Sequence, residues 1–309
     1  VCTFFIFLLT QKYFAEGSDN IAEYFTLILF ALSGIVIMVS YQNLSMLFIG
    51  LEIMSVSLYI LAGIRKLNFA SNEASLKYFL MGAFSTGFLL FGITLIYGAT
   101  GSFDINGIGN MVNQAKLQDI MLNPYGPILY GGIILIFVGL LFKISAAPFH
   151  FWTPDVYDGA PSIFTAFMST VVKTAGVAAT YRLLSISFPA MYGLWGNPLV
   201  YITCLTLFIG NITAVYQQSF KRMLAYSSIS HAGYLLITVL AKTPTTNSSI
   251  LFYSLAYSIA TISAFAVLMA VSEAQAKTGK TDESFNALNG LDKNNPLLAF
   301  ALAVSMLSL

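Results

Sequence analysis

The sequence predicts an all-α, multi-spanning membrane protein, and three observations point to that fold class. Of its 309 residues, 57% are hydrophobic and only 9% are charged, whereas about 25% charged residues are usual in soluble domains. The apolar residues gather in runs of about 20, the length that crosses a bilayer as a helix. Polar segments rich in Gly, Pro, Asn and Asp separate these runs. Together these features exclude a soluble enzyme fold.

The apolar runs define the candidate membrane spans in chain order. They cover residues 1–9, 22–41, 43–64, 74–98, 128–147, 162–188, 198–217, 223–241 and 249–272, and a further span opens at Pro296. The connection at 99–127 is long enough to form a small structure of its own. Because both ends of the sequence fall inside apolar runs, we expect the chain to be the middle of a longer protein.

Composition also bears on cofactors and partners. The net charge of +1 gives no reason to expect nucleic acid as a partner. Cys2 and Cys204 are far apart in the sequence and lie in apolar runs. We therefore expect them to be small core residues, and not to bind a metal or to form a disulfide. Nucleotide, zinc, flavin and quinone-binding patterns are missing from the sequence. We therefore expect no cofactor and no metal in this chain, and no covalent chemistry by the chain alone.

The distribution of positive residues predicts an orientation. The side of the membrane on which the span 22–41 begins receives most of the Lys and Arg residues, and the positive-inside rule makes this side cytoplasmic. The residues on this side are Lys12, Arg65, Lys66, Lys221, Arg222, Lys277, Lys280 and Lys293. The opposite side has Lys116, Lys242 and Arg182. The 99–127 loop then faces outward. The predicted location is a membrane crossed many times, the inner membrane of a bacterial cell.

The segment 128–157 departs from a simple helix. It is apolar up to Ala147, meets Pro148, and continues as FHFWTPDVYDGAP with two more prolines. Proline removes a backbone donor and clashes with the preceding turn. A broken membrane helix is tolerated only where protein or water covers the freed backbone groups, and such helices often mark transport sites.

A weak internal repeat accompanies this break. The pattern of Glu52, Ser55 and Tyr59 parallels that of Ser227, Ser230 and Tyr234. The segment at 251–253 lies about as far after the second pattern as Lys77-Tyr78-Phe79 lies after the first. Corresponding positions in the two copies are about 175 residues apart. Each match alone is poor support, but together they suggest two related halves, as in many transporters.

Three ionisable residues fall at mid-membrane depth. Glu52 and Lys173 lie near the centres of their spans, and Lys143 lies five residues before the proline break. Each buried charge costs roughly 2.5–3.5 kcal/mol on insertion scales. A locked pair of Glu52 and Lys143 is the structural alternative, but one carboxylate cannot neutralise two amines. A lysine whose pKa changes as its charged partner moves can take up and release a proton. We therefore assign Glu52, Lys143 and Lys173 to proton transfer.

Three further residues are weaker candidates for the same role. Lys77 lies about one turn into its span, where snorkelling to the interface explains it equally well. His150 follows the break and either relays protons or satisfies a carbonyl. His231 shares its span with several hydroxyl residues and extends a polar chain. Asp155 and Asp158 need no chemistry, because capping the next helix or binding a neighbouring loop explains them.

The stretch GLLFKISAAPFHFWTPDVYDGAP at 139–161 closely resembles the subunit N family of respiratory complex I, the NADH–quinone oxidoreductase. This family is the bacterial counterpart of mitochondrial subunit 2 and one of the antiporter-like subunits. The motifs GLE (50–52), KYF (77–79), VKTA (172–175) and KRMLAYSSISHAGY (221–234) also match. The resemblance covers essentially the whole chain.

The resemblance implies two inverted five-helix repeats, each with a discontinuous helix, and a proton path along the membrane midplane. Residues 22–188 would form the first repeat and 198–309 a truncated second one, after the end of a preceding helix and a loop at 1–21. Glu52, Lys143 and Lys173 match the family's glutamate, broken-helix lysine and connecting lysine. A second broken-helix lysine is expected beyond Leu309. The implied partners are other membrane subunits of complex I, including neighbouring antiporter-like subunits, and lipid.

Three functions remain open at this stage. The first is a proton-translocating, non-redox subunit of NADH–quinone oxidoreductase, with quinone reduced elsewhere in the complex. The second is a subunit of a multisubunit Na+/H+ antiporter, which Lys173 disfavours because related antiporter-like subunits generally carry histidine there. The third is a structural membrane scaffold with a locked ion pair, which two lysines against one glutamate disfavour.

Overall fold

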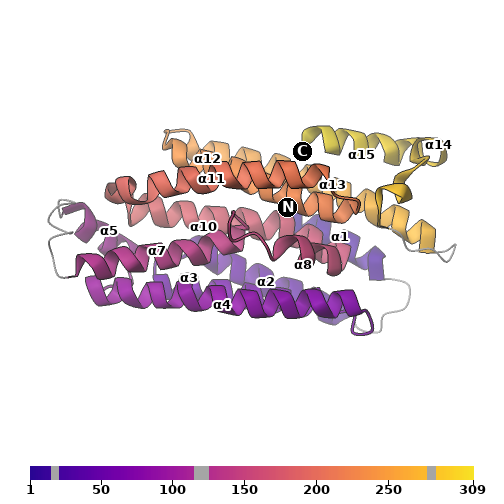
Figure 1. The fold of residues 1–309 in the computed structure, drawn as a ribbon. Helices are drawn as coiled ribbons and strands as arrows, with labels where there is room; N and C mark the ends of the chain where they lie inside the picture. The colour runs from indigo at the N-terminus through magenta and orange to yellow at the C-terminus, as the bar shows by residue number, and fades with distance from the viewer. Residues whose placement is uncertain (15–20, 115–124, 277–282) are drawn as a thin grey trace.

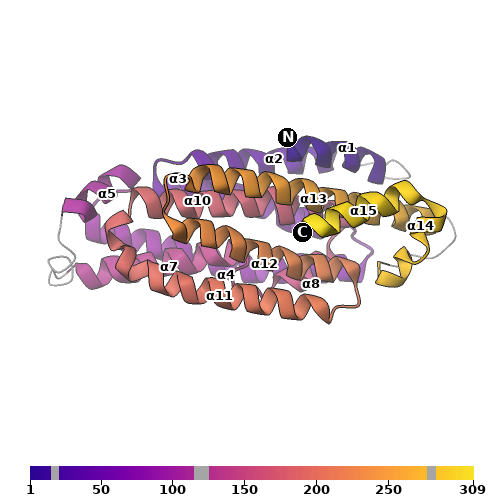
Figure 2. The same cartoon turned by 90° about the horizontal axis from the view of Figure 1, so that it is seen from above.

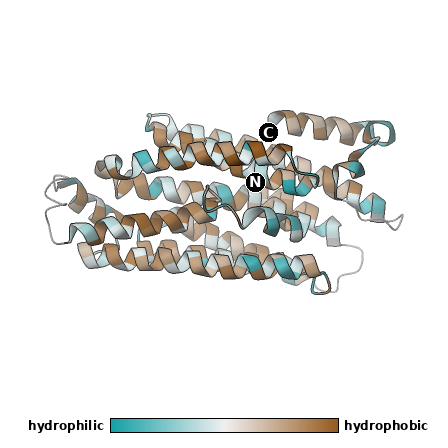
Figure 3. Ribbon diagram, in the orientation of Figure 1, coloured by the Kyte–Doolittle hydropathy of each residue, from teal (hydrophilic) through white to brown (hydrophobic). Residues whose placement is uncertain are grey.

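The computed structural model describes residues 1–14, 21–114, 125–276 and 283–309. Within these ranges, eight helices are long and apolar enough to cross a membrane. They run side by side in one elongated bundle (Figure 1, Figure 2). Apolar residues extend along the helices, and hydrophilic residues gather towards their ends (Figure 3). The prediction of an all-α, multi-spanning membrane fold is confirmed.

Most predicted spans agree with the helices to within a few residues. The described elements are α1 (Cys2–Phe14), α2 (Ile21–Ser40), α3 (Leu44–Ala62), α4 (Phe69–Thr100), α5 (Ile105–Gln114), α7 (Gly126–Ile144), α8 (Thr153–Gly159), α9 (Ser162–Phe167), the π-helix η1 (Met168–Val172), α10 (Lys173–Ile186), the 3-10 helix η2 (Pro189–Met191), α11 (Tyr192–Val215), α12 (Phe220–Ala241), α13 (Thr246–Ala276), the 3-10 helix η3 (Phe285–Leu288), α14 (Leu291–Asn294) and α15 (Pro296–Ser308).

One span differs from the prediction, and the long connection contains structure of its own. The span expected at 198–217 begins earlier, because Pro198 lies inside α11 rather than at its start. Proline there gives up only the backbone hydrogen bond to the carbonyl four residues before it. The long connection after residue 99 contains α5, a short amphipathic helix, while residues 115–124 of that connection lie outside the described residues.

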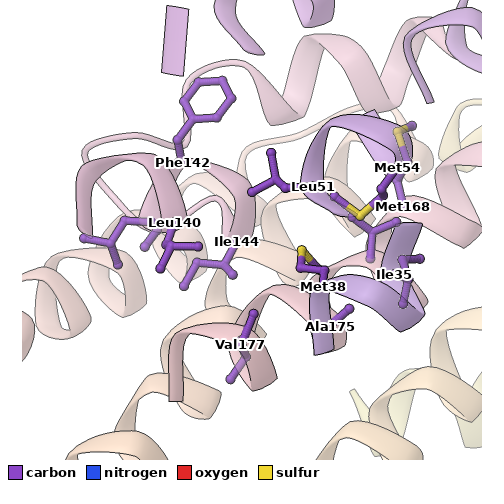
Figure 4. Packing of buried hydrophobic residues seen from close by; sticks show 14 of the residues in the cluster. Ile35, Met38, Leu51, Met54, Leu140, Phe142, Ile144, Met168, Ala175 and Val177 are labelled. Carbon is purple, nitrogen blue, oxygen red and sulfur yellow. The ribbon is translucent and has the colours of Figure 1, made fainter. Parts of the chain in front are cut away.

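The helix formed by α9, η1 and α10 occupies the centre of the bundle. In its most apolar window 83% of the residues are buried, against 22% in the span at 189–215. Met168, Ala175 and Val177 from this helix pack with apolar side chains of α2, α3 and α7 (Figure 4). The π-turn of η1 ends directly before Lys173, and such turns occur frequently at functional sites.

The predicted interruption near Pro148 is present. Helix α7 ends at Ile144, Ser145 takes a left-handed conformation with φ of 62°, and α8 starts only at Thr153. The amide of Ala147 donates a 2.9 Å hydrogen bond to the hydroxyl of Thr206 on α11. Protein groups therefore cover backbone that the break sets free, as a discontinuous helix at membrane depth requires.

Two helix pairs pack similarly closely at a glycine. A Cβ atom on Gly34 of α2 would lie 2.5 Å from the backbone nitrogen of Met54 on α3. A Cβ atom on Gly210 of α11 would lie 2.8 Å from the backbone nitrogen of Ser230 on α12. Both close approaches join residues 20 apart along the chain, in helix pairs that start from opposite ends of the bundle. The repeat boundaries at 22–188 and 198–309 stay a prediction.

One end of the bundle, here called the basic end, is where α3 ends and α12 begins. Arg65, Lys66, Lys221 and Arg222 lie there, and Arg182 and Lys242 lie towards the other end, as predicted. Lys116, Lys277 and Lys280 lie outside the described residues. Which face of the membrane the basic end occupies stays a prediction from the positive-inside rule.

Candidate functional site

Lys143 is the last charged residue of α7 before the break and is only 3% exposed. Its Nζ atom donates to the Ser55 hydroxyl at 2.8 Å and to the Tyr59 hydroxyl at 3.3 Å, both on α3. The amine also lies 5.6 Å from the centre of the Tyr59 ring. The partners of this buried amine are thus neutral oxygens and an aromatic face.

Glu52 lies on the same face of α3 as Ser55 and Tyr59, because residues three and seven positions apart share a helix face. No N···O contact of 4.0 Å or less joins Glu52 and Lys143, although both residues are described. The Oε1 atom of Glu52 is buried without a hydrogen-bond partner. Lys143 therefore faces the helix of Glu52, and Ser55 lies one turn from the carboxylate.

Lys173 is 2% exposed in the central helix. Its Nζ atom donates to both the backbone oxygen and the hydroxyl of Ser228 on α12, each at 2.8 Å. The Tyr157 ring centre lies 5.8 Å from the amine. Like Lys143, Lys173 contacts neutral oxygens and a tyrosine face, and it belongs to none of the ion pairs among the described residues.

A continuous line of aromatic contacts joins the two lysines. The Tyr59 ring meets Tyr78 edge-on with centres 4.7 Å apart, and Tyr78 stacks on Trp152 at 4.7 Å. Trp152 in turn meets Tyr157 at 6.1 Å. These rings come from α3, α4, the break and α8, so the interruption of α7 brings Trp152 and Tyr157 between the lysines.

Lys77 has different surroundings. Its amine forms 2.8 Å ion pairs with Glu73 and Asp155, and Arg222 contacts Asp155 at 2.9 Å. Asp158 accepts a hydrogen bond from Ser219 at 2.8 Å. We call Glu73, Lys77, Asp155, Asp158 and Arg222 the α8 charge cluster; it lines a cavity of about 170 Å³. Asp158 contacts a neighbouring loop as expected, but Asp155 bridges α4 and α12 instead of capping a helix.

Lys221 is a buried residue that the sequence did not single out. It is 3% exposed, donates to the carbonyl of Ala160 at 2.6 Å and pairs with Glu283 at 3.3 Å. In the sequence, Lys221 is one of two adjacent basic residues near the start of a helix, and its neighbour Arg222 is far more exposed. No feature of the sequence indicates which of the two is buried.

The two histidines lie in different places. His150 is in the break, and its Nδ1 atom is buried without a hydrogen bond of standard geometry. His231 is 5% exposed on α12, one turn from Ser228, and its Nδ1 atom lies 2.6 Å from the Tyr253 hydroxyl of α13. His231 thus extends the polar surroundings of Lys173, whereas His150 lies beside the break that follows Lys143.

The described part of the chain has no group of three or more His, Cys, Asp or Glu residues that could hold a metal ion. Serine and tyrosine hydroxyls both donate and accept hydrogen bonds. A buried amine held by such groups, with no carboxylate in contact, can release a proton and take it up again. An amine between two carboxylates, such as Lys77, is held in its charged form.

Comparisons with known proteins agree with this geometry. Residues 41–309 match the family described as NADH:quinone oxidoreductase/Mrp antiporter, TM. NADH-quinone oxidoreductase subunit N of Flavobacterium psychrophilum is 44% identical over 309 residues, which cover 100% of this chain and 65% of the relative. The chain thus spans about two thirds of that relative's length.

Solved structures give the same picture. A chain of respiratory complex I from Thermus thermophilus with bound aureothin is 33% identical, with a TM-score of 0.73, over 99% of this chain and 64% of that chain. A chain of the Mrp complex from Dietzia sp. DQ12-45-1b is 21% identical, with a TM-score of 0.72, over 99% of this chain and 62% of that chain, a likeness of fold alone. The chain is a multi-pass membrane protein that belongs to the transmembrane family of NADH:quinone oxidoreductases and Mrp antiporters.

Proposed function

We propose that this chain is the proton-translocating part of a subunit N of NADH–quinone oxidoreductase. Its buried lysines would carry protons through the membrane while quinone is reduced elsewhere in the complex. The chain performs no redox step of its own and needs no cofactor or metal. Its partners would be the other membrane subunits of the complex, among them neighbouring antiporter-like subunits, in the inner membrane of a bacterial cell.

One observation carries the proposal. Lys143 and Lys173 are both nearly fully buried, and both contact only neutral oxygens and tyrosine rings. Keeping an unpaired ammonium inside a membrane protein is costly, so such residues mark ion pathways by default. Glu52 is the acid whose charge favours protonation of Lys143, and Ser55, three residues after Glu52 on α3, accepts a hydrogen bond from Lys143.

The higher identity to a complex I chain than to an Mrp chain, 33% against 21%, favours the quinone oxidoreductase over the antiporter. A locked-pair scaffold is disfavoured because Glu52 is not in contact with Lys143. The antiporter alternative makes a different prediction, since loss of the protein would then impair sodium tolerance.

Purification of the tagged full-length protein from its host tests the assignment. We expect subunits of NADH–quinone oxidoreductase to co-purify, and deletion of the gene to abolish NADH-driven proton pumping in membrane vesicles. Co-purification of sodium/proton antiporter subunits, with loss of sodium tolerance and normal NADH-driven pumping in the deletion strain, would overturn the proposal.

A further inference from the structure

A short segment at the basic end is attached to the start of α12. Residues 283–288, here called the strap, precede α14 and α15 and pair with the turn between α11 and α12 through an antiparallel bridge. The amide of Phe220 donates to the carbonyl of Glu283 at 3.1 Å. The amide of Phe285 donates to the carbonyl of Gln218 at 3.4 Å. The main chain of the strap is thus fixed to the turn that begins α12.

Side chains join the strap to two further elements. The Glu283 carboxylate pairs with the Lys221 amine at 3.3 Å and accepts a hydrogen bond from the Ser162 hydroxyl at 2.9 Å. Ser162 is the first residue of α9. The Lys221 amine also donates at 2.6 Å to the carbonyl of Ala160, which caps the C-terminal end of α8. Lys221 therefore contacts the end of α8 and the strap at the same time, and Glu283 contacts the start of the central helix.

Burial makes this pair different from the other ion pairs at the basic end. The side chain of Lys221 is 3% exposed and that of Glu283 is 33% exposed, whereas Arg222 and Asp155 are 35% and 36% exposed. Taking an ammonium out of water is costly, and well-packed apolar residues often stabilise a protein as much as a buried ion pair does. The best-attested use of a buried polar pair is to fix the registry of the elements that it joins. The pair of Lys221 and Glu283 is suited to that use.

The two ends of this connection belong to different parts of the candidate site. Helix α8 follows the break after Lys143, and its Tyr157 ring centre lies 5.8 Å from the Lys173 amine. The strap continues through α14 into α15. Helices α8 and α14 lie towards the same end of the bundle in both views (Figure 1, Figure 2). A shift of α8 therefore acts on the strap through the Ala160 carbonyl, the Lys221 amine and the Glu283 carboxylate.

We propose that Lys221 and Glu283 form a latch that holds the strap against the end of α8, and that movements of α8 pass through this latch to α15. Lys221 is a positioning residue, because it fixes where α8 and the strap lie and carries no proton itself. The latch does not depend on the proposed function. Its effect on proton pumping rests on that function.

The latch is tested by hydrogen exchange of the assembled complex, measured by mass spectrometry. In Lys221→Met, only main-chain bonds hold the strap, so its amides should exchange about tenfold faster through local opening. Glu73→Gln is the matched control, because it removes a 2.8 Å ion pair of Lys77 near the same end without a contact to the strap. Its strap should exchange at the native rate. Native exchange of the strap in Lys221→Met would overturn the latch.

The double variant Lys221→Met, Glu283→Gln covers the case in which Lys221→Met does not assemble. It leaves no unpaired charge where the pair was, so the complex should assemble. Its strap should also exchange about tenfold faster than in the native complex. Native exchange in the double variant would mean that the main-chain bonds alone hold the strap, and would overturn the latch.

The transmission to α15 is tested by the number of protons pumped per NADH oxidised in the double variant. A purely structural pair would change the amount of assembled complex but not this ratio. We expect the ratio to fall by about twofold in the double variant and to stay native in Glu73→Gln. A native ratio in the double variant, together with a lowered ratio in Lys143→Met, would overturn the transmission and leave the proposed function intact. A native ratio in Lys143→Met would refute the proposed function, whereas hydrogen exchange would still decide the latch.

Discussion

Lys77 and Lys143 lie on adjacent helices, α4 and α7, but their surroundings are opposite. Lys77 is 35% exposed and sits between two carboxylates at 2.8 Å. Lys143 is 3% exposed and contacts two neutral hydroxyls. The first arrangement holds a charge in place and fastens α8 to α4 and α12. In the proposed function, the second leaves the amine free to change its protonation state, so the contacts of a lysine, and not the residue type, would decide whether it carries protons.

The largest effect is expected from Lys143→Met. Methionine fills a similar volume without a titratable group, so the complex should assemble while NADH–quinone reductase activity falls by about tenfold or more. Activity of membranes, normalised to the amount of assembled complex, measures this. Lys66→Met, at an exposed position beyond α3, should leave activity unchanged. Full activity of the assembled Lys143→Met variant would show that Lys143 has only a structural role.

Substitution of Lys173 should have an intermediate effect. Lys173→Ala removes the amine but leaves a space beside Ser228 that water can occupy, so pumping should fall less than in Lys143→Met. Lys173→His should restore part of it, because imidazole also relays protons. Proton uptake by reconstituted vesicles measures both variants. Equal loss in the alanine and histidine variants would show that the site needs the lysine shape rather than a titratable group.

Glu52→Gln should act through Lys143 without breaking a direct contact. Removing the carboxylate charge makes protonation of Lys143 less favourable, because the remaining partners are neutral. We expect a few-fold loss of pumping, and a smaller loss at lower pH, where proton loading is easier. The pH profile of pumping in proteoliposomes checks this. A normal proton-to-electron ratio at every pH would remove Glu52 from the mechanism.

The smallest effect on pumping is expected from Lys77→Met. This change leaves Asp155 paired with Arg222 but removes the Lys77–Asp155 ion pair that joins α4 to α8. The loss should destabilise the packing of α8 on α4 by about 1 kcal/mol, the scale of partly exposed ion pairs. Thermal inactivation of the purified complex should shift slightly, and the shift should shrink at high salt. A shift that is insensitive to salt would mean that packing, not charge, links α8 to α4.

The sequence predicts the fold class, the span positions and the interruption near Pro148, because hydropathy and proline chemistry act locally. It also places Glu52, Lys143 and Lys173 at membrane depth. It does not predict the partners of the lysines, because Ser55 and Lys143 are 88 residues apart and Lys173 and Ser228 are 55 apart. The burial of Lys221 and the earlier start of α11 likewise depend on packing between helices.

The most direct test is the number of protons pumped per NADH oxidised, measured side by side for native, Lys143→Met and Lys77→Met complexes in the same proteoliposomes. If the unpaired amine carries protons and the paired amine holds α8, the ratio falls in Lys143→Met and stays at the native value in Lys77→Met. The reverse pattern, or a native ratio in both variants, would contradict the account.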